Sequence, residues 1–302
     1  MLPVQAASGI NGLLVLDKPA GMTSHDVVSL VRRATGERSI GHLGTLDPMA
    51  TGVLPLLLGR YTRLAQFFSQ AEKQYTGEIR FGFATDSFDA EGKPVTTPLT
   101  LERSLPELVE LARAFQGAID QVPPIFSAKK LGGVPAHQLA RAGLPVPVKP
   151  ARIFIHEFRL LALEGDTASF TMTVSAGGYV RSVAHELGAL AGCGGHLSQL
   201  RRVRAGVFSL KQAITVEQLK EASGAGAEAI QALLPHPRTL LPEMPSVTVD
   251  EQTAGRLHNG MQVNLPDFSN APLVKVFTGP ADLLCVARRI AGTLMQPHVV
   301  IG

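Results

Sequence analysis

Residues 41–60 read GHLGTLDPMATGVLPLLLGR, and they place one acid, Asp47, in a loop that leads into an apolar run. Glycines in this loop permit backbone angles that are closed to other residues, and Pro48 fixes φ directly after the acid. The run VLPLLLG is too short to span a bilayer and is typical of a buried strand or core helix. We therefore expect the loop to be tethered to the core, with its carboxylate serving as nucleophile, general base, metal ligand or turn former.

The same stretch resembles the catalytic-loop motif of the TruB family of tRNA pseudouridine synthases. That motif reads Gly-His-x-Gly-Thr-Leu-Asp-Pro and continues with Ala-Thr-Gly-Val-Leu, and the match here is nearly unbroken. The resemblance implies that Asp47 is the catalytic nucleophile in the isomerisation of uridine 55 in the T-arm of tRNA, without metal or other cofactor. It also implies an α+β fold, with a mixed, largely antiparallel sheet flanked by helices and an active cleft across its middle.

Composition fits a globular RNA-modifying protein without requiring one. Of 302 residues, 45% are hydrophobic and 18% are charged, so the chain can bury a core as one large domain or two. The net charge is only +3 although the isoelectric point is about 9.0. A nucleic-acid surface would therefore be a local basic patch rather than a property of the whole chain.

The cysteine pattern and the N-terminal segment favour a cytoplasmic protein. Cys193 and Cys285 lie far apart and are expected to be reduced thiols. Cys193 is close to His196, but no second Cys or His pair accompanies them, so a zinc site is not expected. The first fifteen residues lack the basic and long apolar regions of a secretory signal, and no apolar run approaches the ~20 residues of a membrane span.

Residues 12–24, GLLVLDKPAGMTS, predict a short buried strand at 13–16, then a turn and a helix over about 25–35 that Ser24 caps. The Lys-Pro-x-Gly-x-Thr-Ser pattern resembles the first conserved motif of the family. Lys18 is open to two interpretations: a solvated surface lysine, or a residue near the active site that contributes to substrate binding, as the resemblance implies.

Residues 75–85, YTGEIRFGFAT, alternate well enough to predict a strand. The acids that follow, Asp86, Asp89 and Glu91, are expected to form a loop of solvated charges, because the ligand spacing of a calcium loop is absent. The segment resembles a family pattern of Tyr, Gly and then Thr-Asp-x-x-Asp-x-x-Gly. The resemblance implies that Tyr75 is the active-site tyrosine and stacks on the target uracil.

The middle of the chain predicts an amphipathic helix over 101–116 and antiparallel strands over 152–161 and 167–174. Between them, QVPPIFSAKK resembles a family stretch that ends in a lysine, which implies an RNA-binding role for Lys130. The family usually has a tyrosine shortly afterwards. Here His137 or a neighbour would have to replace it.

Residues 175–188, SAGGYVRSVAHELG, predict a sharp turn into a helix with Tyr179 and Arg181 at its start. Such an arginine could satisfy a buried carboxylate. The segment resembles the family pattern Gly-x-Tyr-x-Arg, and the resemblance implies that this carboxylate is Asp47. The pairing would keep Asp47 ionised and oriented, as a nucleophile requires. The resemblance also implies that Tyr179 and Leu200 line the pocket and that His42 contacts the flipped nucleotide or a neighbouring phosphate.

A run of arginines follows in GCGGHLSQLRRVRAGVFSL, residues 192–210. Flanked by apolar residues, Arg201, Arg202 and Arg204 could hold phosphates while their neighbours stay buried. The segment resembles the family motif Cys-Gly-x-His-x-x-x-Leu-Arg-Arg-x-x-x-Gly. On that basis Arg201 and Arg202 are predicted to bind RNA.

The chain is predicted to contain a catalytic domain over 8–242 and a small β-rich module over 246–302, separated by a Pro-rich segment. The module resembles a PUA-type RNA-binding domain, although its charges nearly cancel and a purely structural cap is an alternative. We expect a monomer that needs no other protein and takes tRNA as its partner.

Three alternative functions remain open at this stage. One is an RNA chaperone or scaffold whose acid is vestigial. The second is a hydrolase that cleaves a glycosidic bond, which would need a second carboxylate beside Asp47, and none stands out in the sequence. The third is a family member that acts on another RNA.

Overall fold

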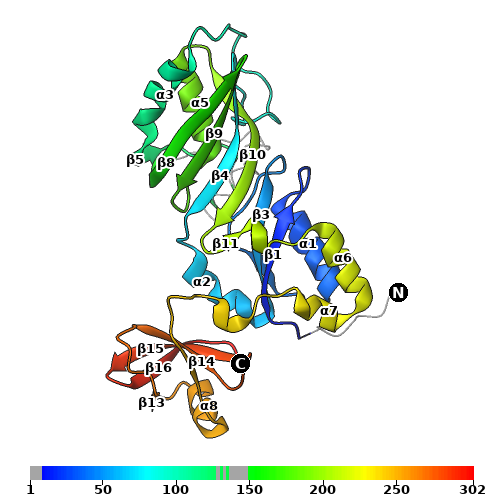
Figure 1. Ribbon diagram of the computed structural model, residues 1–302, viewed down its shortest axis with the longest axis vertical. Helices are drawn as coiled ribbons and strands as arrows, with labels where there is room; N and C mark the ends of the chain where they lie inside the picture. Colours follow the sequence, from blue (N-terminus) through cyan, green and yellow to red (C-terminus); the bar gives the residue numbers. More distant parts are fainter. Residues whose placement is uncertain (1–8, 127–129, 132–133, 136–148) are drawn as a thin grey trace.

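The computed structural model describes residues 9–126, 130–131, 134–135 and 149–302. Its centre is a nine-stranded sheet in the order β1-β3-β10-β4-β9-β8-β5, with β2 paired to β3 and β11 paired to β10 (Figure 1). Every pairing in it is antiparallel except that between β3 and β10. The predicted fold class, with a mixed and largely antiparallel sheet, is therefore confirmed.

The strands of this sheet are β1 (Gly12–Lys18), β2 (Ile40–His42), β3 (Thr51–Leu58), β4 (Lys73–Phe81), β5 (Gly117–Gln121), β8 (Ala151–Glu164), β9 (Thr167–Val174), β10 (Gly195–Ala205) and β11 (Phe208–Ser209). Its α-helices are α1 (Ser24–Thr35), α2 (Ala65–Phe68), α3 (Leu105–Ala112), α5 (Val180–Ala191), α6 (Val216–Ala225) and α7 (Ala227–Ala232). Short 3₁₀ turns are η1 (Gly59–Leu64), η2 (Arg113–Phe115), η3 (Leu210–Gln212) and η4 (Pro237–Thr239). A separate hairpin consists of β6 (Lys130–Leu131) and β7 (Val134–Pro135).

The apolar run after Asp47 forms β3, the strand between β1 and β10. Alternate side chains of a strand point to opposite faces, so a run that is apolar throughout predicts burial on both. Leu54 and Leu56 join the main core beneath the helices, whereas Val53 and Leu57 join a second core on the other face. Of the two interpretations of VLPLLLG, the buried strand is therefore the right one.

Helices α1, α3, α5 and α6 all contribute side chains to the main core, and in Figure 1 they lie in two groups beside the two halves of the sheet. The predicted apolar face of the 101–116 helix is present, with Leu108 and Phe115 buried, although the α-helix itself covers only Leu105–Ala112. Between β3 and β4 the chain forms η1 followed by the four-residue α2.

The C-terminal residues form a second sheet in the order β12-β14-β15-β16-β13, with helix α8 beside it (Figure 1). Its elements are β12 (Ser246–Thr248), α8 (Glu251–His258), β13 (Val263–Asn264), β14 (Leu273–Phe277), β15 (Leu283–Ala291) and β16 (Leu294–Val300). Phe277 and Val286 of this sheet share a hydrophobic core with Leu13 and Val15 of β1. The module is therefore docked against the larger sheet.

Both cysteines are free and buried, as expected of reduced thiols. In the part of the chain that the structure describes, no helix is long and apolar enough to cross a membrane.

Candidate active site

The Asp47 loop connects β2 to β3 and is anchored by three other segments. Ser24, the first residue of α1, accepts a hydrogen bond from the backbone N–H of Leu46 at 2.8 Å and donates its hydroxyl to the Leu46 carbonyl at 3.0 Å. Ser24 was predicted to cap α1, and that prediction is wrong. Thr23 is the cap, in a reciprocal arrangement with Asp26, which leaves Ser24 to hold the loop.

Lys18 forms the second anchor of the loop. Its ammonium group donates to the carbonyl oxygens of Pro19, Met22 and Pro48, the last at 3.1 Å, and the side chain is fully buried. Burial lowers the pKa of Lys18 to about 8, although Asp47 acts in the opposite direction. The solvated interpretation of Lys18 is therefore wrong. A direct substrate contact is not available either, because all three N–H donors are already used.

Arg202 of β10 is the third anchor. Its guanidinium donates to the carbonyl oxygens of Val53, Thr45 and Gly44 at 2.7, 3.3 and 3.1 Å, and the side chain is almost fully buried. Close packing here also explains one glycine: a Cβ at Gly52, where φ is +103°, would lie 2.2 Å from the Arg202 carbonyl oxygen. The prediction that Arg202 contacts phosphate is wrong, because its side chain is buried behind the loop and bound to backbone carbonyl oxygens.

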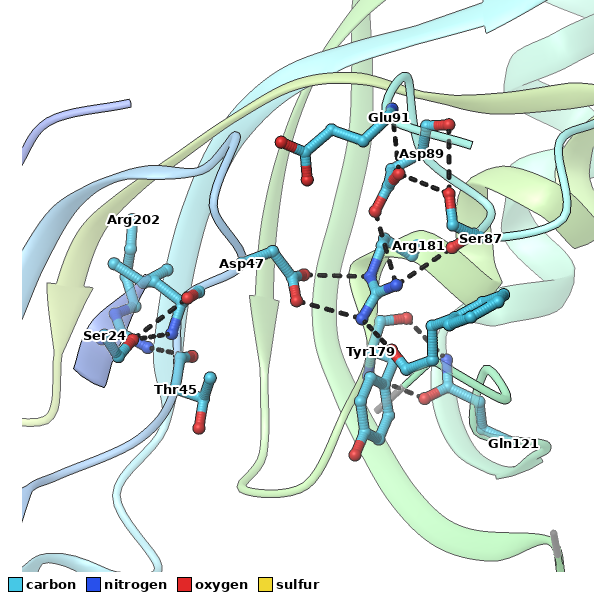
Figure 2. Close-up of polar contacts among 12 residues, drawn as sticks. Ser24, Thr45, Asp47, Ser87, Asp89, Glu91, Gln121, Tyr179, Arg181 and Arg202 are labelled. Atoms are coloured by element: carbon cyan, nitrogen blue, oxygen red, sulfur yellow. Dashed lines mark hydrogen bonds and ion pairs between the residues drawn. The ribbon is translucent and has the colours of Figure 1, made fainter. Parts of the chain in front are cut away.

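Arg181, in the first turn of α5, holds the Asp47 carboxylate (Figure 2). Its Nη2 donates to Asp47 Oδ1 at 3.0 Å, and its Nε forms an ion-pair contact with Oδ2 at 2.9 Å. The residues are 134 positions apart in the chain. The contact between Asp47 and Arg181 predicted from the sequence is therefore present.

The same guanidinium also contacts a second acid. Arg181 Nη1 lies 3.4 Å from Asp89 Oδ2 and donates to the Ser87 carbonyl, while Nη2 also donates to the carbonyl of Phe126. The Asp89 side chain is only 5% exposed, like that of Arg181. The expectation that the 86–91 acids form a solvated loop is thus wrong for Asp89, and so is the expectation that no second carboxylate stands near Asp47.

The burial of Asp89 had a signal in the sequence, but the cluster of acids around it suggested a solvated loop instead. Asp89 is the second acid of the Thr-Asp-x-x-Asp-x-x-Gly pattern, and its carboxylate accepts bonds from the Ser87 hydroxyl and the Glu91 backbone N–H. These bonds fold the turn inward. A pattern of acids and glycines alone is the same for a solvated loop and for a turn that closes over an arginine.

The Asp47 carboxylate is under opposing electrostatic influences. Desolvation by the surrounding protein raises the pKa of Asp47 above its ordinary value, and the negative charge of Asp89 acts in the same direction. The positive charge and hydrogen bond of Arg181 oppose both effects. The result is a partly exposed carboxylate, 31% accessible, whose ionised form is favoured by Arg181 alone among these three influences.

Two pockets meet at Asp47. The first, which we call the tyrosine pocket, has a volume of about 530 Å³. Its lining includes Asp47, Lys73, Tyr75, Tyr179, Arg181, Leu200 and Arg202. Tyr75 lies on β4 and is largely buried, while Tyr179 precedes α5 and exchanges two backbone hydrogen bonds with the Gln121 side chain (Figure 2). An apolar, aromatic lining with a carboxylate at one side is suited to a single heterocyclic base.

The second pocket, the acidic pocket, has a volume of about 570 Å³ and shares Asp47 and Arg181 with the first. Its lining also includes His25, His42, Asp86, Asp89 and Glu91. Burial, followed by the charges of Arg202 and His25, lowers the pKa of His42. These effects favour the neutral form of the His42 ring. Among the described residues, no group of three or more His, Cys, Asp and Glu side chains is arranged to hold a metal ion.

Sequence comparison identifies the family. Residues 32–180 match the model of the TruB family pseudouridylate synthase N-terminal domain, and residues 181–240 match that of the tRNA pseudouridylate synthase B C-terminal domain. The chain belongs to the TruB family of tRNA pseudouridine synthases. The predicted family and isomerase class are thereby confirmed.

Several curated relatives resemble most of the chain. A tRNA pseudouridine synthase B from Solibacter usitatus (strain Ellin6076) is 43% identical over 97% of this chain and 100% of its own length. Another, from Symbiobacterium thermophilum (strain DSM 24528 / JCM 14929 / IAM 14863 / T), is 44% identical over 85% of this chain and 84% of its own. The resemblance therefore extends well beyond the catalytic-loop motif.

Solved structures support the fold. A chain in the crystal structure of a Cbf5-Nop10-Gar1 complex has a TM-score of 0.70 and 23% identity, covering 99% of this chain and 87% of that one. A chain from an H/ACA RNP bound to a substrate RNA containing 2'-deoxyuridine has a TM-score of 0.68 and 22% identity, covering 96% of this chain and 85% of that one. At these identities the likeness concerns architecture.

Three residues singled out in the sequence need separate comment. The backbone of Lys130 lies in β6, but its side chain lies outside the part that the structure describes, as does the whole of His137. Arg201 precedes the buried Arg202 on β10, and its guanidinium pairs with Asp17 at 2.7 and 3.1 Å while remaining 41% exposed. A phosphate contact from Arg201 stays a prediction.

The two neighbouring arginines should respond differently to substitution. Arg202→Met would leave three carbonyl oxygens, two in the loop and one in β3, without their donor, so we expect the free energy of unfolding to fall by about 3 kcal/mol or more. Arg201→Met removes an exposed ion pair and should lower it by less than about 1 kcal/mol, while reducing the salt dependence of RNA binding. Urea unfolding and RNA titrations at several salt concentrations measure both effects. Equal losses of stability would contradict the assignment of Arg202 to the interior.

Proposed function

We propose that this chain converts uridine 55 in the T-arm of tRNA to pseudouridine, with Asp47 as the nucleophile. The observation that carries the proposal is the Asp47 carboxylate, paired with Arg181 and placed where the tyrosine pocket and the acidic pocket meet. The TruB family supplies the reaction and the class of RNA. The position within tRNA rests on the resemblance of the catalytic motifs.

The target base must leave its stack before Asp47 can reach it. Extruding one loop nucleotide costs a few kcal/mol, which contacts in a closely fitting pocket can offset. The tyrosine pocket supplies the Tyr75 ring as a surface for the uracil, with Tyr179 and Leu200 beside it. His42 reaches the same nucleotide or its neighbour from the acidic pocket.

The reaction needs no external oxidant, reductant or water. The bond between N1 of uracil and C1′ of ribose breaks, a bond between C5 and C1′ forms, and the proton on C5 is replaced by the new glycosidic bond while N1 gains one. Asp47 can assist by attack at C1′, by attack at C6 of the ring, or through a glycal route in which Tyr75 removes the proton from C2′. Each route uses the ionised carboxylate, and the positive charge of Arg181 favours that ionisation.

We assign the division of labour along the chain as residues 8–242 for catalysis and residues 246–302 for a PUA-like accessory module. The module shares a hydrophobic core with β1 and is also joined by hydrogen bonds from Arg60 and Arg63 to the carbonyl oxygens of Ile301 and Val300. A module fixed in this way would present its RNA contacts at a constant position relative to the active site.

Transcripts with altered T-arms test the substrate. An unmodified tRNA transcript should gain one pseudouridine, at position 55, when mapped by carbodiimide treatment and primer extension. A transcript with a disrupted T-arm should remain unmodified, whereas an isolated T-arm hairpin should still react. Modification at another position, or equal modification of both transcripts, would contradict the proposal. Release of free uracil would instead indicate a hydrolase.

A further inference from the structure

Three described cationic side chains line the tyrosine pocket, and two of them are already bound to oxygens of the protein. Among the described residues that line it, Lys73, Arg181 and Arg202 carry the positive charge. Each nitrogen of Arg181 lies within 3.4 Å of an oxygen of Asp47, Asp89, Ser87 or Phe126. Arg202 is buried and bound to three carbonyl oxygens. Neither arginine is therefore placed to bind an anion that enters the pocket.

Lys73 differs from both arginines. It is the first residue of β4, two positions before Tyr75, so the two side chains emerge on the same face of the strand and both line the pocket. Its Nζ donates to the carbonyl oxygen of Ala71, which leaves two of three N–H donors unused by the described residues. No described carboxylate lies within ion-pair distance of it. Its neighbour Glu72 is paired with His156 and Arg204 instead.

The surroundings of Lys73 are short of negative charge. Its side chain is half-buried beside the Asp47 loop, where Lys73 and Arg202 both lie close to Gly44. A Cβ at Gly44 would lie 3.7 Å from Lys73 Cε and 3.6 Å from Arg202 Nη1. Desolvation and the positive charge of Arg202 both lower the pKa of Lys73. An anion placed there would relieve the repulsion between the two cations and occupy the unused donors.

A nucleotide that enters the tyrosine pocket brings such an anion with it, because a phosphate flanks the sugar on each side. We propose that Lys73 binds one of the two phosphates flanking the target uridine and so positions that nucleotide against Tyr75 and Asp47. The inference rests on the proposed function, since it takes the tyrosine pocket as the site of the target base. It assigns Lys73 a role in substrate positioning that is distinct from the chemistry of Asp47.

The first test compares Lys73→Met with Lys73→Arg and with Lys220→Met, a control at an exposed lysine on α6. The substrate is a T-arm hairpin RNA. Loss of one charged hydrogen bond to phosphate should lower kcat/KM by about 10- to 100-fold in Lys73→Met. The salt-dependence slope of RNA binding should fall by about 0.7 to 0.9. Lys73→Arg should recover most of both, and Lys220→Met should behave as the native protein.

The second test neutralises the phosphate instead of the lysine. The affinity of the protein is measured for hairpins that carry a methylphosphonate at the 5′ or the 3′ linkage of the target uridine. The reference hairpins have phosphodiesters at both linkages, and both kinds of hairpin carry the same 2′-O-methyl groups. The native protein should lose about 10-fold or more in affinity at one of the two linkages. Lys73→Met should lose nothing further at that linkage, because the partner of the phosphate is already absent.

The outcomes separate cleanly. The proposal is overturned if Lys73→Met stays within twofold of the native protein, if its losses add to those of both methylphosphonates, or if the native protein tolerates both substitutions. The measurement on the native protein with both methylphosphonate hairpins does not depend on any variant. If Lys73→Met does not fold, Lys73→Gln replaces it, because the Gln side chain keeps a donor for the Ala71 carbonyl. Failure of the native protein to modify uridine 55 would overturn the proposed function instead, and the binding measurements would still decide on Lys73.

Discussion

Replacing Asp47 with Asn should lower the single-turnover rate of pseudouridine formation by at least about 10⁴-fold while leaving tRNA affinity within a fewfold of the native value. The amide has nearly the same volume as the carboxylate, so the two pockets keep their shape. Arg181 stays fixed by Asp89 and by the carbonyl oxygens of Ser87 and Phe126. The substitution removes the ionised carboxylate oxygen that attacks carbon. Carbodiimide primer extension measures the product, and filter binding measures the affinity.

A matched control is available in the acidic pocket. Asp86 also lines that pocket, but its carboxylate accepts a hydrogen bond from the Lys93 backbone N–H and makes no contact with Arg181 among those described. Asp86→Asn should therefore retain activity within about tenfold of the native protein, since a neutral acceptor can keep this bond. Undiminished activity in Asp47→Asn would remove the mechanism, and equal losses in both variants would point to a general electrostatic effect of the pocket.

Local patterns in the sequence were enough to predict much of the architecture. The strands at 152–161 and 167–174 follow from simple alternation and form the antiparallel pair β8 and β9. The Asp47–Arg181 contact joins residues 134 positions apart, and no local pattern contains it. It was predictable only because the motifs around both residues resemble one family, whose members bring those motifs together.

The errors at charged residues share a physical cause: their side chains were assumed to face water. Arg201 and Arg202 were expected to bind phosphates together, yet adjacent residues of a strand point to opposite faces, so only one can face solvent. Lys18 and Asp89 are buried because each has partners from segments distant in the chain. Composition cannot indicate such partners, because the energetic cost of burying a charge depends on groups that arrive only when the chain folds.

Substitution of Arg181 should show how strongly the activity depends on ionised Asp47. We expect Arg181→Lys to lower the single-turnover rate by about 10²- to 10³-fold, because an ammonium group cannot contact both carboxylate oxygens and the misplaced acid attacks poorly. The reaction requires the carboxylate, so its rate rises with pH through the pKa of Asp47. Weakening the arginine interaction raises that pKa, since Arg181 lowers it in the native protein. The acid limb of the pH–rate profile should therefore move to higher pH.

Asp89→Asn provides a control of opposite sign. The negative charge of Asp89 raises the pKa of Asp47, so removing it should move the acid limb to lower pH, even though the rate also falls as Arg181 loses one of its supports. Circular dichroism at each pH separates these shifts from acid unfolding. Two variants that touch the same guanidinium would thus displace one titration in opposite directions. Shifts of the same sign, or none, would mean that the observed limb belongs to a group other than Asp47, because a purely structural disturbance of the loop has no reason to distinguish them.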